Sequence, residues 1–174
     1  MEFQELIRQR YSVRSFSPRP VEDEKLQKIL EAGQAAPTAR NGQPQRILVV
    51  KSPEALEKIR QCTPCHYNAP VVLVMCRRPS DSPIDPEKGV NGDPTPLDAS
   101  IALTHMMLCA ADLGLGSCWV GLYYKDKLRQ MFHVPEGLEI VSLLPIGYPA
   151  EDAAPGPAHT QRLPLSETVF FDTF

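Results

Sequence analysis

The stretch Val71-Val72-Leu73-Val74-Met75-Cys76 is apolar at all six of its positions. A run of this length and composition predicts a central strand that is covered on both faces. A second apolar stretch runs from Leu97 to Leu113, where 12 of 17 residues are apolar. A helix that is apolar nearly all round is expected to be buried on all sides, either as a core axis or at a subunit interface. Gly114 ends this helix.

The other elements are predicted from hydrophobic spacing and from cap residues. Ser52 and Pro53, for example, are suited to the N-cap and the first position of a helix. Helices are expected over residues 3–9 and 22–35, and the apolar spacing predicts two more: one that begins at residue 53 and a short one that ends at residue 132. Strands are expected over residues 47–50, 115–122 and 138–146. The 47–50 strand is expected to be buried. Because the linkers between elements are of mixed length, the pattern leaves a mixed and an antiparallel sheet both open.

Length and charge limit the kinds of protein that this chain can be. Its 174 residues fit one domain with a substantial core, over residues 1–174. The net charge of -3 argues against a general nucleic-acid binder. No apolar run reaches the roughly 20 residues that span a bilayer, and the N-terminus shows no signal-peptide pattern. We therefore expect a soluble, cytoplasmic protein that binds neither nucleic acid nor membrane.

The five cysteines are odd in number, which argues against a disulfide framework. Cys62-Thr63-Pro64-Cys65-His66 matches the C-x-x-C-H pattern of haem attachment. Haem is disfavoured without an export signal, and zinc is disfavoured because no second Cys or His pair stands at ligand spacing. A redox dithiol is an open alternative, but two thiols in a turn before a strand are favoured. No metal site is predicted.

Two further segments have an unusual composition. Residues 77–96 contain five prolines and two glycines, which is typical of either a lid near a site or a surface excursion. The tail after Pro149 has three phenylalanines in its last five residues, so we expect it to dock, for instance on a second subunit. His105, inside the apolar helix, is interpreted as a core or interface histidine.

The segment Arg10-Tyr11-Ser12-Val13-Arg14 places two guanidiniums and a hydroxyl within five residues. In an extended chain alternate residues share a face, so Arg10, Ser12 and Arg14 are expected to point the same way. The planar fork of donors on arginine suits a phosphate dianion. The segment therefore predicts a cradle for a small anionic ligand.

Two polar or glycine-flanked segments indicate that the ligand is also planar. Asn41 and Gln43, in a loop from Ala36 to Pro44, can hydrogen-bond the edge of a heterocycle. Backbone near Trp119 and Gly121 can approach a flat ligand closely. The sequence contains no Gly-x-Gly-x-x-Gly after a strand, no P-loop and no nucleophile-elbow motif. The alternative is that the arginines are solvated and the loop is only a turn.

Four blocks of the sequence, in order, resemble the FMN-dependent nitroreductase family. Arg10–Phe16 is similar to the family's opening Arg-x-Ser-x-Arg/Lys-x-Phe, and Ala36–Pro44 to its Pro-Ser-x-x-Asn-x-Gln-Pro loop. Asp112–Trp119 resembles the helix end that leads into the flavin-facing strand, and Arg162–Leu165 the C-terminal basic-Leu-Pro segment. The resemblance implies an α+β protein with three layers (α/β/α), a mostly antiparallel central sheet and an intertwined homodimer.

The resemblance also implies a role for each site residue. Arg10, Ser12 and Arg14, beside Tyr11 and joined by Arg162, would hold the FMN phosphate. The loop that covers the isoalloxazine would come from the partner subunit. The glycine-flanked strand would supply the backbone that lies beside the hydride-accepting nitrogen of the flavin. The residues implied in these two segments are Pro37, Thr38, Ala39, Asn41 and Gln43, and Trp119, Val120 and Gly121. Two positions depart from the family pattern: Gln45 replaces a common aromatic residue, and Thr160 a common lysine.

The activity implied by the resemblance is FMN-dependent oxidoreduction with NADH or NADPH as hydride donor. An electron-poor acceptor such as a nitroaromatic or a quinone would follow the donor at the same place, which predicts ping-pong kinetics. Dehalogenation, flavin fragmentation and heterocycle oxidation are related possibilities. No catalytic side chain is predicted, because the flavin carries the chemistry. The alternative is a non-catalytic flavin-binding sensor or storage protein.

Overall fold

A four-stranded sheet forms the centre of the protein in a computed structural model that describes residues 2–80 and 92–174. The strand order is β1-β2-β4-β3, and each pair of neighbouring strands is antiparallel. This arrangement decides between the two sheet types that the sequence left open. The strands are β1 (Gln45–Val50), β2 (Val71–Arg77), β3 (Gly116–Ser117) and β4 (Glu139–Gly147).

The apolar stretch that opens the sequence analysis is confirmed as a central strand. β2 pairs with β1 on one side and β4 on the other, and Val71 to Cys76 are all buried. The expected burial of the strand over 47–50 is wrong, because β1 pairs only with β2 and lies at the edge of the sheet. Only Val50 of β1 is buried, and Leu48 is 38% exposed.

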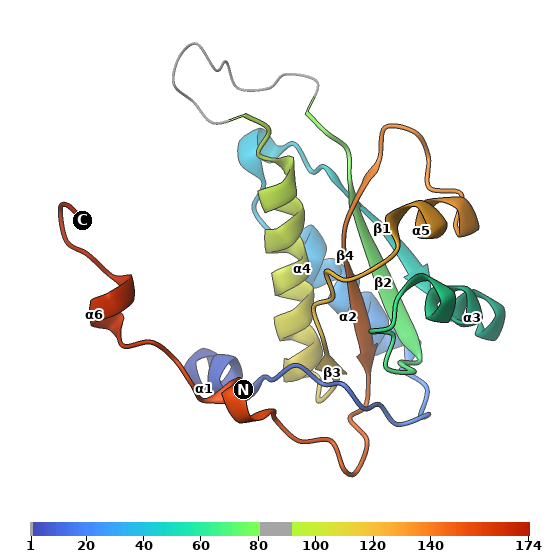
Figure 1. The fold of residues 1–174 in the computed structure, drawn as a ribbon, viewed down its shortest axis with the longest axis horizontal. Helices are drawn as coiled ribbons and strands as arrows, with labels where there is room; N and C mark the ends of the chain where they lie inside the picture. The colour runs from blue at the N-terminus through green and yellow to red at the C-terminus, as the bar shows by residue number, and fades with distance from the viewer. Residues whose placement is uncertain (1, 81–91) are drawn as a thin grey trace.

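Helices cover both faces of the sheet, as Figure 1 shows. Buried residues of α2 (Asp23–Gln34) and α4 (Thr95–Asp112) form one core cluster with the sheet. Buried residues of α3 (Pro53–Cys62) and α5 (Lys125–Met131) form a second cluster on the opposite face. The predicted three-layer α+β fold is therefore confirmed. The two remaining helices, α1 (Phe3–Gln9) and α6 (Leu165–Thr168), lie outside these layers.

Helix α4 is the longest helix of the described chain, with 18 residues. Its buried face includes Leu103 and Met106, which are fully enclosed. The expectation of burial on all sides does not hold within one chain, because Leu97 is 69% exposed and Ile101 39%. Such an apolar face on a helix otherwise packed in the core is suited to contact with a second molecule.

The N-terminal arginine segment is attached to the sheet through β3. Val13 N–H donates to the Ser117 carbonyl at 2.9 Å, and Ser12 forms an isolated parallel bridge with Ser117. Val13 is 1% exposed and packs directly on Gly116, where a Cβ would lie 2.5 Å from Val13 Cγ2. Only a residue without a side chain allows this close approach.

The C-terminal tail extends away from the body of the chain, and Figure 1 shows α6 separated from the layers. Phe171 is 83% exposed and Phe174 104%. Phe170 and Phe174 contact each other, with ring centroids 5.1 Å apart. Within a single chain, these side chains have little apolar surface to pack against.

The proline-rich segment over 77–96 is described only at its ends. Arg77 belongs to β2, and its guanidinium pairs with Asp93 and with Glu139, which ties the end of β2 to β4 and to the residues before α4. The lid hypothesis concerns residues 77–96, and residues 81–91 of this segment lie outside the described residues. None of the helices in the described ranges is long and apolar enough to cross a membrane.

The close contact between Gly116 and Val13 generates a stability prediction. We expect Gly116→Ala to lower the free energy of unfolding by about 1–3 kcal/mol, because the added methyl meets a β-branched side chain in a packed core. Urea unfolding measures the change as a lower midpoint at unchanged m-value. Gly121→Ala is the control, since a Cβ there meets nothing within 4 Å. A Val13→Ala/Gly116→Ala double variant should be less destabilised than the sum of the single changes; strict additivity would contradict the proposed clash.

Candidate functional site

A cavity of about 370 Å³ lies between the N-terminal arginine segment and the C-terminal residues that fold over it. Three of its lining residues are arginines, and they come from both ends of the sequence. The lining consists of Arg10, Tyr11, Ser12, Arg14, Gly156, Pro157, Ala158, His159 and Arg162. The structure thus brings all the predicted phosphate ligands to one cavity.

The extended backbone explains why the two arginines and the serine share this cavity. Val13 points inward and is 1% exposed, whereas its neighbours Ser12 and Arg14 line the cavity on the other face. Arg14 Nη1 also donates to the Ser12 carbonyl at 3.4 Å. Arg10, Ser12 and Arg14 therefore share the cavity as the alternation predicted, although Tyr11 lines it as well.

The C-terminal wall of the cavity is held in place by local contacts. Arg162 Nη1 donates to the carbonyls of Ala158 at 3.1 Å and Gln161 at 2.7 Å. The Tyr11 ring contacts the edge of His159, with centroids 6.1 Å apart, and the Tyr11 hydroxyl donates to the Ala153 carbonyl at 3.3 Å. Sequence reasoning missed His159, which stands next to Thr160, the position where the family pattern has a lysine.

Behind the arginines, two weakly acidic groups support the segment. Burial raises the pKa of the Cys118 thiol, although Arg14 lowers it and the Ser12 side chain is a hydrogen-bond partner. Burial and a hydrogen bond with Cys65 raise the pKa of Tyr67 to about 12, and Arg14 donates to its phenol oxygen. Both groups are protonated at neutral pH, so they position Ser12 and Arg14 without adding a negative charge to the cavity.

The Cys62 thiol belongs to the core rather than to the site. It is fully buried at the end of α3, and its Sγ donates to Met131 Sδ at 3.6 Å. Burial raises its pKa, which makes the reactive thiolate scarce. Cys65, its C-x-x-C neighbour, is also a free thiol. The geometry supports the interpretation of two thiols in a turn before β2 over a redox dithiol.

The polar loop is anchored at the opposite end of α4. Ala39 N–H donates to Asp98 Oδ1 at 2.9 Å, and Gln43 N–H donates to Thr38 Oγ1 at 3.1 Å. The loop backbone is left-handed at Asn41 (φ 55°) and at Gln43 (φ 45°). Both of these side chains are exposed, as is Pro37, so they are available to a ligand or to a neighbouring molecule.

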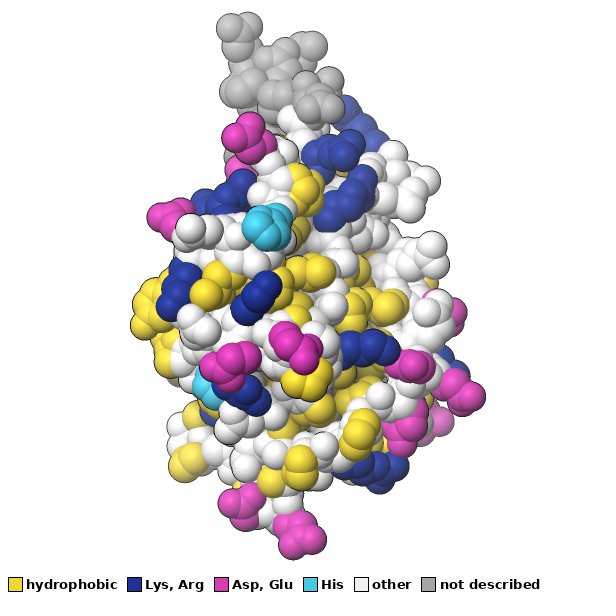
Figure 2. Space-filling model, turned by 90° about the vertical axis from the view of Figure 1, so that its right-hand side faces the viewer, with side chains coloured by type: hydrophobic (Ala, Val, Ile, Leu, Met, Phe, Trp, Pro, Cys, Tyr) yellow, Lys and Arg dark blue, Asp and Glu magenta, His cyan; other side chains and the backbone are white. Residues whose placement is uncertain are grey.

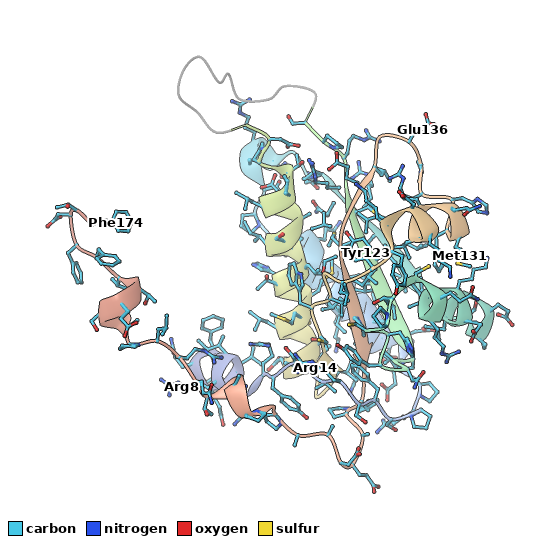
Figure 3. The ribbon with its side chains drawn as sticks, viewed as in Figure 1. Arg8, Arg14, Tyr123, Met131, Glu136 and Phe174 are labelled. Carbon is cyan, nitrogen blue, oxygen red and sulfur yellow. The ribbon has the colours of Figure 1, made fainter. Side chains whose placement is uncertain are left out.

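The two halves of the predicted site do not meet within one chain. The arginine cavity lies beside β3, just after the C-terminal end of α4, whereas the loop is tied to Asp98 in the first turn of that helix. At a rise of 1.5 Å per residue, α4 separates these ends by about 27 Å. Figure 3 shows Arg14 near the lower end of α4, on the side away from the loop.

The Val120–Gly121 backbone has only one amide to offer a ligand. Val120 N–H donates to the Leu143 carbonyl at 2.9 Å, and the Val120 carbonyl accepts from Leu143 N–H. The Val120 amide is therefore paired within the chain, and the position of the Val120–Gly121 backbone beside the ligand stays a prediction. Gly121 is exposed, and within the described residues no bond to its N–H is recorded, so the predicted donor is Gly121. Trp119 is half-buried and packs against the α2–α4 cluster.

Comparison with known proteins places these features in a family. The model of the nitroreductase family matches residues 7–66 and 62–148. A Methanothermobacter thermautotrophicus protein named NADH dehydrogenase/NAD(P)H nitroreductase is 35% identical over 159 residues, which cover 87% of this chain and 80% of the relative. The FMN reductase [NAD(P)H] of Bacillus subtilis is 32% identical over 179 residues, with 94% and 70% coverage.

Solved structures agree with the sequence relatives. A nitroreductase family protein from Clostridium difficile 630 superposes with a TM-score of 0.89 at 38% identity, over 100% of both chains. An FMN-dependent nitroreductase from Clostridium difficile R20291 has a TM-score of 0.78 at 26% identity, covering 97% of this chain and 98% of the other. From the matched residues, the shared fold and the ordered sequence blocks, the chain belongs to the nitroreductase family.

Proposed function

We propose that this chain is an NAD(P)H-dependent FMN oxidoreductase that passes a hydride to an electron-poor small molecule, such as a nitroaromatic or a quinone, by ping-pong kinetics. The observation that carries the proposal is the cavity lined by Arg10, Arg14 and Arg162. Three guanidiniums and the Ser12 hydroxyl are donors that suit a phosphate dianion. The FMN reductase and FMN-dependent nitroreductase among the similar proteins support FMN as the cofactor.

The chain's own residues bind and orient FMN, which supplies the hydride-accepting and hydride-donating chemistry when bound. The arginines and Ser12 hold the phosphate, and Gly121 N–H is placed to donate to the ring system. A donor at that position stabilises negative charge as it develops. In this proposal the flavin carries the chemistry, and the protein contributes binding and electrostatics.

A homodimer is part of the proposal, because one chain contains two separated half-sites. If two α4 helices pack antiparallel through their exposed apolar faces, the Pro37–Gln43 loop of one subunit lies near the arginine cavity of the other. The exposed Leu97 and Ile101 support this pairing, and the apolar tail supports an additional contact with the partner. The whole chain, residues 1–174, is a single FMN-binding domain in this proposal, and the free thiols support a cytoplasmic location.

Anaerobic reduction separates this enzyme from the alternative, a non-catalytic flavin-binding protein. We expect the purified protein to be yellow, and NADH or NADPH to bleach its flavin absorbance within seconds in the absence of oxygen. Steady-state rates with a quinone acceptor should give parallel double-reciprocal lines. A flavin that stays oxidised would leave only the binding function, and intersecting lines would exclude the ping-pong order.

Removal of the cavity arginines is expected to weaken FMN binding. Arg10→Ala and Arg14→Ala should each raise the dissociation constant of FMN about 10- to 100-fold, because each removes a charge-assisted hydrogen bond of about 1.5–3 kcal/mol. The double variant should purify folded and colourless. Arg8→Ala is the matched control, since Arg8 is on α1 and does not line the cavity (Figure 3). Stoichiometric FMN in the double variant, measured from the absorbance spectrum, would refute the phosphate cradle.

Disruption of the α4 face tests the dimer. We expect Ile101→Glu to produce a monomer in analytical ultracentrifugation and to lose FMN as well, because each site needs the partner's loop. Leu48→Glu is a matched control, since Leu48 is 38% exposed and Ile101 39%, but Leu48 lies on the edge strand β1. A monomeric wild-type protein that binds FMN would contradict the shared site.

A further inference from the structure

A second basic cavity lies at the other end of α4 from the FMN cradle. It has a volume of about 390 Å³, and three arginines line it: Arg40, Arg46 and Arg78. We call it the arginine pocket. A neighbouring hollow of about 530 Å³ shares Arg46 and Arg78. Figure 2 shows Lys and Arg side chains gathered at the end of the molecule beside the grey residues.

The pocket is held by backbone contacts between the loop and the strands. Arg46 Nη1 donates to the carbonyls of Gln43 at 3.0 Å and Gln45 at 2.7 Å. Arg78 N–H donates to the Pro44 carbonyl at 2.9 Å, which fixes the start of the segment after β2 against the loop. The three arginines are therefore carried by two neighbouring segments that are joined to each other.

The charges around the pocket favour an anion. Asp98 is the one acidic residue in its described lining, and its Oδ1 already accepts from Ala39 N–H. The ion pairs recorded between described residues include none of the three arginines. Pro94 and Thr95 place the N-terminal end of α4 in the lining, where the positive end of the helix dipole is partly offset by the Asp93 carboxylate, which accepts from Thr95 N–H at 2.9 Å. Guanidiniums beside a helix N-terminus suit phosphate better than a neutral group.

The position of the pocket indicates which phosphate it receives. Ala39, Arg40 and Gly42 belong both to its lining and to the loop that, in the proposed dimer, covers the flavin. A dinucleotide whose nicotinamide lies on the flavin therefore has its adenosine end free to extend along this surface. NADH and NADPH share the pyrophosphate, and NADPH alone carries a 2′-phosphate dianion on the adenosine ribose.

We propose that the arginine pocket binds the 2′-phosphate of NADPH and makes NADPH the preferred hydride donor. This inference rests on the proposed function, because it assumes that a nicotinamide dinucleotide reduces FMN at the adjacent site. NADH and NADPH share the pyrophosphate. If removal of an arginine lowered kcat/KM equally for both donors, the pocket would bind the pyrophosphate and not the 2′-phosphate.

Kinetics of two arginine variants test the proposal. Arg40 is in the left-handed region (φ 54°), which asparagine tolerates, so Arg40→Asn removes the charge without backbone strain. We expect Arg40→Asn and Arg78→Gln each to lower kcat/KM for NADPH about tenfold more than kcat/KM for NADH. Arg78 lies outside the loop that covers the flavin, so Arg78→Gln should leave kcat/KM for NADH unchanged. Arg60→Gln is the matched control, because Arg60 pairs with Glu57 on α3, outside the pocket. An equal loss with both donors, no loss with NADPH, or a wild-type preference for NADH would overturn the proposal.

Direct binding keeps the proposal separate from the proposed function. Calorimetry with adenosine 2′,5′-bisphosphate should give a dissociation constant at least about tenfold lower than with adenosine 5′-monophosphate, and Arg40→Asn with Arg78→Gln should abolish the difference. This measurement needs no turnover. If the protein turns over both donors but binds the two adenosine phosphates equally, the 2′-phosphate assignment is wrong and the proposed function stands. If the protein binds no FMN, the proposed function itself is wrong.

Discussion

The backbone hydrogen bond from Val13 to Ser117 is the contact on which the site depends. It is one bond of 2.9 Å, but it places an extended segment against the end of a sheet whose interior is fully packed. Because Val13 fills the space above Gly116, the side chains on either side of it are directed outward. The charged face of the segment is thus a consequence of apolar packing on its other face, and guanidiniums that would otherwise be mobile are presented together.

Helix α4 organises the rest of the molecule by its length. One of its ends adjoins the segment with Arg10 and Arg14, and its first turn holds the polar loop through Asp98. The carboxylate of Asp98 is 5% exposed and accepts from the Ala39 backbone amide, so it stabilises the loop. The same helix therefore separates two positively charged regions. In the proposed dimer, antiparallel pairing would place the N-terminal end of one α4 beside the C-terminal end of the other.

Local patterns in the sequence predicted the elements whose environment is the same at every position. β2 is the example, since a continuous apolar run needs burial wherever the strand is placed. The existence of α4 was predicted in the same way, but the exposure of Leu97 and Ile101 was not. The burial of β1 could not be predicted in this way, because an edge strand and a central strand have the same local composition and differ only in their neighbours. The resemblance to a family supplied the order of the layers, which spacing alone left open.

Prediction of the site had the same limits. The alternation in Arg10-Tyr11-Ser12-Val13-Arg14 was enough to place three ligands on one face. It gave no sign of His159, because that contact depends on the path of the tail over Tyr11. The Val120–Gly121 backbone was predicted to face the ligand as a unit, but Val120 N–H is paired with Leu143 through a bridge between segments more than twenty residues apart in the sequence. Long-range pairing of this kind has no local signature.

The tail that leaves the body at α6 has a consequence for how the protein matures. An arm with Phe171 and Phe174 in solvent is costly to a solitary chain, and in the proposed dimer a second copy would remove this surface from water. Under the proposed pairing, subunit association and cofactor loading become linked equilibria, so newly made polypeptide acquires its colour at a rate that depends on how much of it has accumulated.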